Sequence, residues 1–323
     1  MAQQDPPPFD LVGRVAAGHD PAAALDQLRR RRLPRSLGKQ TDAAAHYRPS
    51  DELLMAINMA IQVAAPLLLT GKPGTGKTVA GAFIGRYFGI PVFPFQVKST
   101  TTADDLKYDF DAVGYLHWAQ SDNTSGAPPG RRRPANRRAK TRRDFLQKRP
   151  LWHAYDHATE SVILIDEIDK APRDFPNDLL HELDQHSFRH PFDDTEVIEP
   201  RCGRPPVVVV TSNDERRLPD AFLRRCIFHR IELTETLVAD AVQAHVGDFP
   251  HLGPDELAAA QKRFWELRDS PLDKKPSTAE LLVWLCILSA RRIDAEALRS
   301  ASLAALPAIG ALVKDPQDLE ALG

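Results

Sequence analysis

A glycine-rich segment is the first place in this sequence where chemistry could occur. It reads GKPGTGKT and consists of Gly71, Lys72, Pro73, Gly74, Thr75, Gly76, Lys77 and Thr78. Glycines at this spacing let backbone N–H groups point at phosphate oxygens, while the lysine reaches the β- and γ-phosphates and the final hydroxyl ligates Mg²⁺. A helix that begins here would add its positive N-terminal end. We therefore expect the segment to bind a nucleoside triphosphate together with Mg²⁺.

Two adjacent acids are the second feature. Asp166 and Glu167 directly follow the apolar run at 163–165, and unpaired charge beside a buried strand is costly. In nucleoside triphosphatases with this kind of loop, the Asp at such a strand end helps to hold Mg²⁺. A Glu beside it can polarise an attacking water as a general base. We predict Thr78 and Asp166 as Mg²⁺ ligands and Glu167 as the catalytic base; the alternative is that the acids only begin a helix.

A polar amide follows another apolar run. The run at 207–211 leads through Ser212 into Asn213. If this strand lies beside the one that ends in Asp166, Asn213 would come near the γ-phosphate and the water. The alternative is an asparagine that only forms a turn.

The elements that must position these residues alternate between strand and helix. Apolar residues at helical spacing predict a helix from Asp51, and a second helix is predicted at 78–87. Short apolar runs predict strands, at 66–70, 91–97, 161–166, 207–211 and 227–233. This alternation predicts an α/β domain with a mainly parallel, five-stranded sheet between helices.

The character of the sequence changes after about residue 234. Ala and Leu replace the β-branched runs, and helices are predicted at 257–268, 278–292 and 295–306. The prediction is therefore an N-terminal extension at 1–45, a nucleotide-binding domain at 46–233 and a small all-helical lid domain at 234–323.

An arginine-rich segment interrupts the predicted α/β domain. Residues 121–148 are poor in apolar side chains, and 131–143 contain eight basic residues without an acid. This composition predicts a flexible loop. Such a loop could bind a phosphate backbone, but no aromatic residue is interleaved to stack on bases. A solvated loop, or one that docks on an acidic partner, is therefore favoured over nucleic acid.

Composition narrows the class of protein. The 323 residues carry 42 Lys and Arg against 44 Asp and Glu, a net charge of −2, which excludes a polycation that coats nucleic acid. No run of about 18 apolar residues indicates a membrane span, and the N-terminus lacks the pattern of a secretory signal. The cysteines have no metal-binding spacing. The motif-like stretch from His181 to His186 is one residue too long for the zinc motif H-E-x-x-H. We expect a cytoplasmic protein without a membrane partner.

The order of these motifs resembles the AAA+ ATPases, and within them the MoxR family. The resemblance covers about residues 46–290, and its most specific parts are GKPGTGKT (71–78), ILIDEID (163–169), VVVVTSN (207–213) and LPDAFLRRC (218–226). It implies that residues 71–78 are the Walker A loop, that Asp166 and Glu167 are the Walker B pair, and that Asn213 is sensor 1.

The resemblance also implies an arginine finger that enters the nucleotide site of a neighbouring subunit. Arg225 matches the position of the family's finger better, and Arg224 is the alternative. A third interpretation is that both arginines only form salt bridges at the surface. Such a finger requires a homo-oligomeric ring, usually a hexamer, because its guanidinium stabilises charge on the transferred phosphoryl group. The sequence departs from the family at sensor 2, where Ala279 stands in place of an expected arginine and Lys274 or Lys275 could substitute.

These features predict a Mg²⁺-ATP hydrolase that does mechanical work. The resemblance implies a chaperone-like ATPase that remodels or activates a client protein, often one with a von Willebrand factor A domain. The alternatives are a motor stimulated by nucleic acid and a slow nucleotide-dependent switch. No N/TKxD-like motif is present, so ATP is expected rather than GTP, and Tyr47 is a candidate neighbour of the base.

Overall fold

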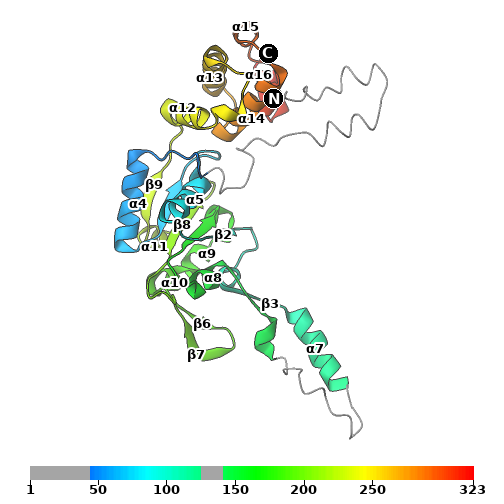
Figure 1. The fold of residues 1–323 in the computed structure, drawn as a ribbon. Coiled ribbons are helices and arrows are strands. Elements are labelled where there is room, and N and C mark those ends of the chain that lie inside the picture. Colours follow the sequence, from blue (N-terminus) through cyan, green and yellow to red (C-terminus); the bar gives the residue numbers. More distant parts are fainter. Residues whose placement is uncertain (1–43, 125–140) are drawn as a thin grey trace, which may run out of the picture. The chain divides into compact units, whose positions relative to one another are not determined.

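The computed structural model describes residues 44–124 and 141–323, with only the backbone for 121–124 (Figure 1). Most of the predicted N-terminal extension and residues 125–140 of the arginine-rich segment lie outside the described residues. The chain divides into two compact units. One comprises residues 51–71 and 81–231, and the other comprises the segment before 51 together with 72–80 and 232–323. The predicted domain limits at 45 and 233 remain predictions.

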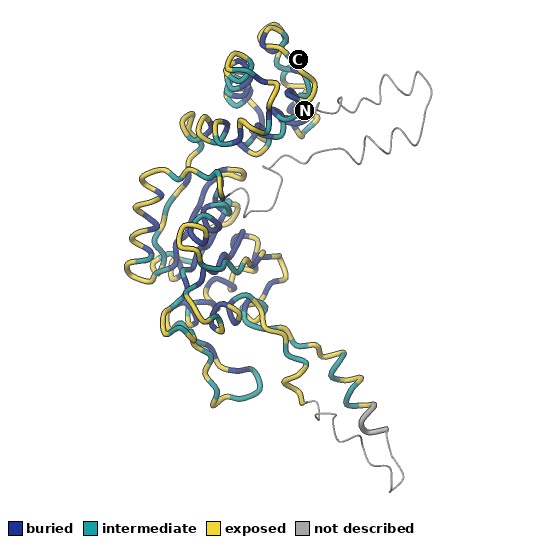
Figure 2. Tube along the Cα trace, viewed as in Figure 1, coloured by how far each residue is buried: buried dark blue, intermediate teal, exposed yellow. Residues whose placement is uncertain are grey.

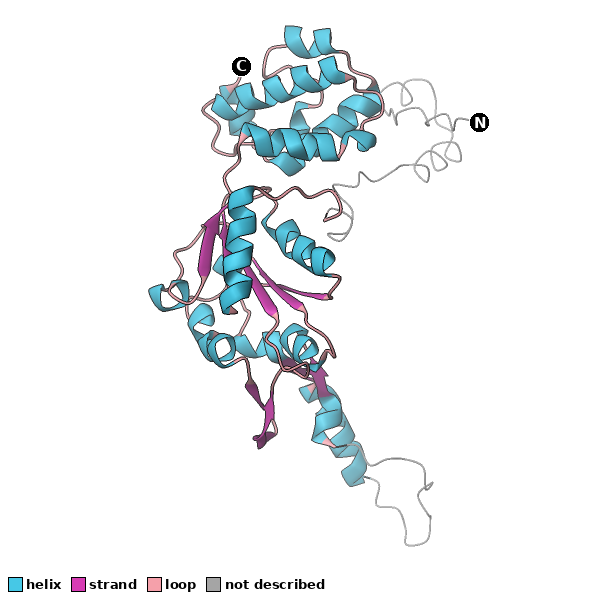
Figure 3. Ribbon diagram, turned by 60° about the vertical axis from the view of Figure 1, so that its left-hand side comes forward, coloured by secondary structure: helices cyan, strands magenta, loops and turns pink. Residues whose placement is uncertain are grey.

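A five-stranded parallel sheet is the centre of the first unit (Figure 3). Its strands follow the predicted apolar runs: β1 (Leu67–Thr70), β2 (Val92–Gln96), β5 (Val162–Asp166), β8 (Val207–Ser212) and β9 (Ile227–Arg230). Their order is β2-β5-β8-β1-β9, and every neighbouring pair is parallel. Strands β1 and β5 are buried along their whole length (Figure 2), as expected for a sheet covered on both faces. The predicted α/β fold is confirmed.

The register of the sheet brings the predicted chemical residues to one edge. Thr70 at the end of β1 pairs with Ser212 at the end of β8, and Gln96 at the end of β2 pairs with Asp166. Because all these strands are parallel, their carboxyl ends meet at the same edge. The glycine-rich loop leaves β1 there, and the acids leave β5.

Helices on the sheet complete the core of the first unit. Helix α4 (Asp51–Val63) packs on β1 and β9, and α8 (Pro150–Asp156) packs on β2 and β5. Shorter elements follow β5 and β8. They are η3 (Ile168–Lys170), α9 (Phe175–Asp178) and α10 (Leu180–Gln185) after β5, and α11 (Asp220–Leu223) after β8. Helix α5 (Lys77–Phe88) follows the glycine-rich loop, close to its predicted position. No described helix is long and apolar enough to cross a membrane.

The described ends of the arginine-rich segment, 121–124 and 141–148, contain helix and strand. Helix α7 (Ala112–Thr124) runs into its beginning, and η2 (Arg142–Phe145) and β4 (Leu146–Lys148) form its end. Strand β4 pairs with β3 (Tyr108–Phe110), which follows α6 (Ala103–Lys107). The prediction of a flexible loop over 121–148 is therefore wrong at both ends. At the C-terminal end, the guanidinium carbon of Arg142 lies 4.3 Å from the ring centre of Phe192, and this cation–π contact helps to order η2. Phe192 lies between β6 (Phe188–His190) and β7 (Asp193–Ile198).

The second unit is helical from residue 235 to the end. It contains α12 (Glu235–Ala244), η4 (Val246–Asp248), α13 (Pro254–Asp269), α14 (Thr278–Arg291), α15 (Ala295–Ser300), η5 (Ile309–Ala311) and α16 (Pro316–Ala321). Buried side chains such as Trp284 and Phe264 form its core. The helix predicted at 295–306 is wrong in its second half. Ala301 adopts an extended conformation, and its carbonyl accepts a hydrogen bond from Arg263, so the helix ends at Ser300.

Candidate nucleotide-hydrolysis site

A buried hydroxyl joins the two predicted acids at the end of β5. Thr211, on β8, is fully buried, and its Oγ1 donates to Oδ1 of Asp166 at 2.6 Å. Thr211 Oγ1 also accepts a hydrogen bond from the backbone N–H of Glu167 at 2.9 Å. Asp166 is 8% exposed, so this bond fixes a carboxylate that is almost out of contact with solvent. Sequence analysis missed Thr211, although its place one strand over from Asp166 follows from the sheet order.

The side chain of Glu167 is held by three donors. Its Oε2 accepts from Gln96 Nε2 at 2.5 Å and from Lys170 Nζ at 2.6 Å, while its Oε1 accepts from Asn213 Nδ2 at 3.2 Å. The hydrogen bond that Lys170 donates to Glu167 is the main reason why the pKa of Lys170 is raised. The structure thus brings Glu167 and Asn213 into contact, after two strands that lie side by side. The place of Asn213 beside the γ-phosphate stays a prediction.

The backbone at Glu167 is unusual. Its φ of 59° and ψ of 52° lie in the left-handed region, which non-glycine residues rarely occupy. Conformations of this kind cost of order 1–3 kcal/mol and cluster at functional sites. The turn aims the carboxylate of Glu167 toward Gln96 and Asn213 at the sheet edge.

Asp169 organises the loop that carries Asn213. It is 2% exposed, and its Oδ2 accepts from the backbone N–H groups of Asn213 and Glu215, both at 3.1 Å. Within the described part of the chain its Oδ1 has no hydrogen-bond partner. Asp169 therefore positions Asn213 through the backbone. Asp169 is the third acid of the run ILIDEID, so the sequence could have marked it as a candidate. Its role depends on a contact with a residue 44 positions away in sequence.

The glycine-rich loop belongs to the helical unit and is curled as predicted for a phosphate loop. Gly74 and Gly76 have φ angles of 77° and 91°, which side-chain-bearing residues seldom adopt. Lys77 is 5% exposed, and its Nζ donates to the backbone carbonyl of Lys72 at 2.9 Å. The hydroxyl of Thr75 donates to the same carbonyl at 3.0 Å. The lysine ammonium thus lies over its own loop, where it could meet phosphate oxygens.

Tyr47 packs against this loop. A Cβ on Gly76 would lie 2.8 Å from Cε2 of the Tyr47 ring, so only glycine fits beneath the phenol. Burial raises the pKa of the Tyr47 hydroxyl, which keeps the side chain neutral. The Tyr47 ring therefore contacts the loop at Gly76, and its place beside the base stays a prediction.

These motifs were compared with known families. The family that matches is AAA, the "ATPase family associated with various cellular activities", and it aligns with residues 67–235, more than half of the chain. The chain belongs to the AAA family. It is accordingly a nucleotide-binding protein and an ATP hydrolase.

No curated protein matches this AAA ATPase in sequence. A solved structure of a candidate ATPase from Cytophaga hutchinsonii is similar, with 12% sequence identity, a TM-score of 0.39, and coverage of 88% of this chain and 83% of that one.

The two arginines after α11 of the AAA ATPase differ in their surroundings. Arg225 donates from Nε to Asp184 Oδ2 at 2.7 Å and from a terminal nitrogen to the carbonyl of Ala221 at 2.9 Å. Arg224 is exposed, and its guanidinium contacts no acid or carbonyl of the described residues. The surface salt bridge considered for this pair thus exists for Arg225. The choice of finger stays a prediction.

The lysines considered for sensor 2 lie just before α14. Lys274 forms an ion pair with Asp315, with 3.0 Å between Nζ and Oδ2, and this hydrogen bond is the main cause that raises the pKa of Lys274. Ala279 is exposed in the first turn of α14. The side chain of Lys274 is 69% exposed in this pair, and the substitution of a lysine for sensor 2 stays a prediction.

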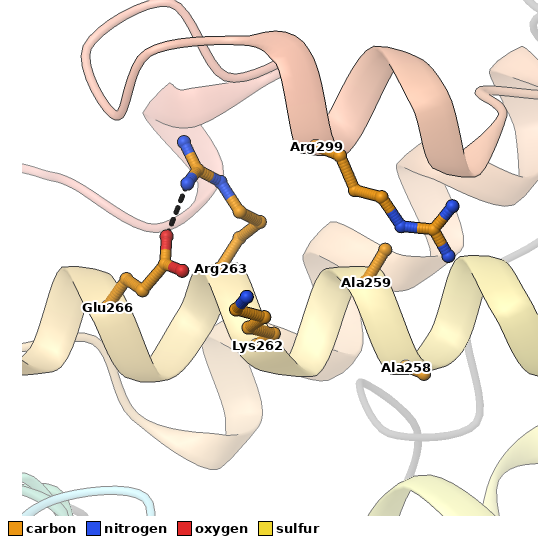
Figure 4. Close-up of a pocket in the computed structure, with 6 residues that line it drawn as sticks. All are labelled: Ala258, Ala259, Lys262, Arg263, Glu266 and Arg299. Carbon is orange, nitrogen blue, oxygen red and sulfur yellow. Dashed lines mark hydrogen bonds and ion pairs between the residues drawn. The ribbon is translucent and has the colours of Figure 1, made fainter.

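A pocket in the helical unit contains none of the predicted site residues (Figure 4). It has a volume of about 230 Å³ and lies between α13 and α15, lined by Ala258, Ala259, Lys262, Arg263, Glu266 and Arg299. Arg263 is already bonded to Glu266 and to the carbonyl of Ala301. Within residues 44–124 and 141–323 no cluster of three or more His, Cys, Asp or Glu side chains could hold a metal.

Proposed function

We propose that this AAA ATPase is a MoxR-like motor that uses Mg²⁺-ATP hydrolysis to remodel or activate a partner protein. The observation that carries the proposal is the hydrogen bond from Asn213 Nδ2 to Glu167 Oε1, which is 3.2 Å long. It lies at the edge where β5 and β8 end. A carboxylate held beside an amide at this edge can orient and activate a water for attack on a γ-phosphate. The run LPDAFLRRC at 218–226 supports the MoxR assignment.

Each predicted residue has a role in this proposal. Lys77 would bind the β- and γ-phosphates, Glu167 would take a proton from the water, and Asn213 would hold the water or the γ-phosphate. Thr78 and Asp166 are the residues that would ligate Mg²⁺, because a hydroxyl and a carboxylate are the hard oxygen donors that this cation prefers. When bound, Mg²⁺ neutralises charge on the phosphates.

We further propose a homo-oligomeric ring, with a hexamer as the expected form, in which Arg225 reaches the neighbouring subunit's nucleotide. Its pair with Asp184 is an exposed one, with side chains 40% and 37% exposed. Exposed pairs contribute only about 0–1 kcal/mol, so release of Arg225 would cost little. The exposed Arg224 is the alternative finger.

The helical residues 234–323 would act as the lid that moves during the cycle and transmits force to a client in the cytoplasm. The family resemblance favours a client with a von Willebrand factor A domain. Nucleic acid is the less favoured partner, since Arg143 at the end of the arginine-rich segment is already paired with Asp193 and Glu196.

Complementation between two inactive variants tests the proposal. Glu167→Gln removes the base and Arg225→Ala removes the finger, so each alone should be inactive. In a ring, the Arg225 of a Glu167→Gln subunit can enter the nucleotide site of a neighbouring Arg225→Ala subunit, which retains Glu167. The mixture should therefore regain turnover. Arg224→Ala is the matched control. A mixture that stays inactive would contradict a finger acting between subunits.

The client and the two alternative functions need separate measurements. The Glu167→Gln protein with Mg²⁺-ATP should capture the client, if the motor remodels proteins. Turnover stimulated by DNA or RNA, with a steep salt dependence, would instead favour the nucleic-acid motor. No turnover of the wild type at any protein concentration would favour the slow switch.

A further inference from the structure

The pocket between α13 and α15 is basic. Its volume is about 230 Å³, and three of its six lining residues are cations, Lys262, Arg263 and Arg299, against one acid, Glu266 (Figure 4). Composition does not explain this grouping, because residues 232–323 carry nine Lys and Arg against 15 Asp and Glu. Positive charge thus gathers in one hollow of a segment that is acidic as a whole.

Two of these cations are not neutralised by the residues that the structure describes. The acid Glu266 is paired with Arg263, whose guanidinium also donates to the carbonyl of Ala301 at 2.5 Å. Lys262 and Arg299 are exposed, and neither forms an ion pair or a hydrogen bond with a described residue. The pocket therefore presents two positive charges that the described part of the chain leaves unpaired, one from each helix.

Small side chains leave the space between the two helices open. Ala258 and Ala259 line the pocket on α13, and the side chain of Arg299 extends from α15 toward them (Figure 4). Ala258 is exposed, so the pocket opens to the surface. Sites that enclose a small molecule have volumes of roughly 300–1,000 Å³, which is more than this pocket offers. Its size and open mouth suit one or two side chains that a partner protein presents.

We propose that the pocket between α13 and α15 binds an acidic segment of a partner protein, with carboxylates of that segment on Lys262 and Arg299. An ammonium and a planar guanidinium both form charge-assisted hydrogen bonds with carboxylate oxygens. A nucleic acid is the wrong partner, because its many phosphates need an extended basic surface, whereas residues 232–323 are acidic as a whole. None of the residues that line the pocket belongs to the proposed hydrolysis site, so this binding is separate from the proposed motor function.

Charge reversal tests this binding in the full-length protein. The probe is a fluorescein-labelled hexaglutamate peptide at low salt, with hexaglutamine as the uncharged comparison, and polarisation measures binding. The wild type should bind hexaglutamate alone. The double variant Lys262→Glu, Arg299→Glu should bind it about tenfold more weakly, because two attractive charge pairs become repulsive. Ala258→Leu changes no charge but fills the pocket with a larger side chain, so it should weaken binding as well.

A double variant with the same change of charge outside the pocket is the matched control. Lys314→Glu, Arg291→Glu alters two exposed cations of the same unit and should bind hexaglutamate nearly as the wild type does. All these variants should keep the melting temperature and the ATPase turnover of the wild type. Equal losses of binding in the pocket and control variants would overturn the proposal, as would a wild type that does not bind hexaglutamate. Binding of inorganic phosphate that depends on Lys262 and Arg299, without binding of hexaglutamate, would overturn it in favour of a phosphate site.

Discussion

The acid cluster at the end of β5 and the glycine-rich loop beside α14 differ in how far their polar groups are hydrogen-bonded within the protein. In the acid cluster, Glu167 already has three hydrogen-bond donors, and Asp166 is bonded to a buried threonine. Beside the loop, the hydroxyl of Thr278 is buried without a partner among the described residues. The first arrangement fixes the geometry of catalytic groups before the substrate arrives. The second arrangement leaves a buried hydroxyl without a hydrogen bond from the described residues. The contrast separates chemistry from binding, and each half can be tested alone.

Removal of the base should give the largest effect on turnover. Glu167→Gln keeps the size of the side chain but cannot accept a proton, so kcat should fall by about 10²–10⁴-fold. Binding of Mg²⁺-ATP should remain, because the loop is untouched. Phosphate release measures the first quantity and calorimetry the second. Glu215→Gln, at an exposed residue whose backbone N–H donates to Asp169, is the control with the same change of charge. Turnover above a tenth of the wild type would disprove the assignment.

The opposite pattern should follow from a change in the loop. Lys77→Ala should weaken ATP binding by at least about tenfold, because a charge-assisted hydrogen bond to phosphate is lost. The protein should remain folded, since the ammonium of Lys77 donates to a carbonyl of its own loop, that of Lys72. Titration with an ATP analogue and circular dichroism provide the two readouts. Wild-type affinity in Lys77→Ala would remove the basis for the nucleotide loop.

A buried ion pair outside the acid cluster should affect stability without affecting chemistry. Lys107 donates to Glu182 at 2.9 Å, and both side chains are nearly buried. Lys107→Met would leave the carboxylate of Glu182 unpaired and should reduce the free energy of unfolding by about 3 kcal/mol. Turnover measured well below the melting temperature should change little. A loss of turnover without a loss of stability would contradict the separation.

The same pair predicts a dependence on pH. Burial works to lower the pKa of Lys107, but hydrogen bonds to Asp104 and Glu182 outweigh it, so the pKa lies above the usual 10.5. The folded state therefore binds this proton more tightly, and the stabilisation is complete below pH 10.5 and lost as the pH rises through the raised pKa. Urea unfolding across this window should show a decline in the wild type that Lys107→Met lacks.

Loss of the hydroxyl that joins the acids should give the smallest change in stability. Thr211→Val removes the donor to Asp166 and the acceptor of the Glu167 N–H group. The free energy of unfolding should fall by about 2 kcal/mol, because a buried N–H is left without a partner. Thr211→Ser retains the hydroxyl and should behave as the wild type does. Equal free energies of unfolding for the Val and Ser variants would show that the hydrogen bonds of the Thr211 hydroxyl do not stabilise the acid cluster.

Prediction from sequence succeeded where a short run of residues is enough. The apolar runs before Gly71 and Asp166 predicted β1 and β5, because a fully buried parallel strand is apolar along its whole length. It failed for residues 295–306, where Arg263 from another helix takes the carbonyl of Ala301. It also failed for Arg142, which is ordered by the aromatic ring of Phe192, 50 positions later. Both failures involve partners distant in sequence.

The sequence by itself determined the phosphate loop, the acid pair and the class of fold, since each depends on residue types at short spacings. Only the tertiary structure decided that Thr211 joins Asp166 to Glu167, that Asp169 holds the loop of Asn213, and that the first turn of α14 meets Gly74. These contacts join residues more than 40 positions apart. Sheet register and the close approach of a helix to a glycine bring them together, and no local pattern encodes either.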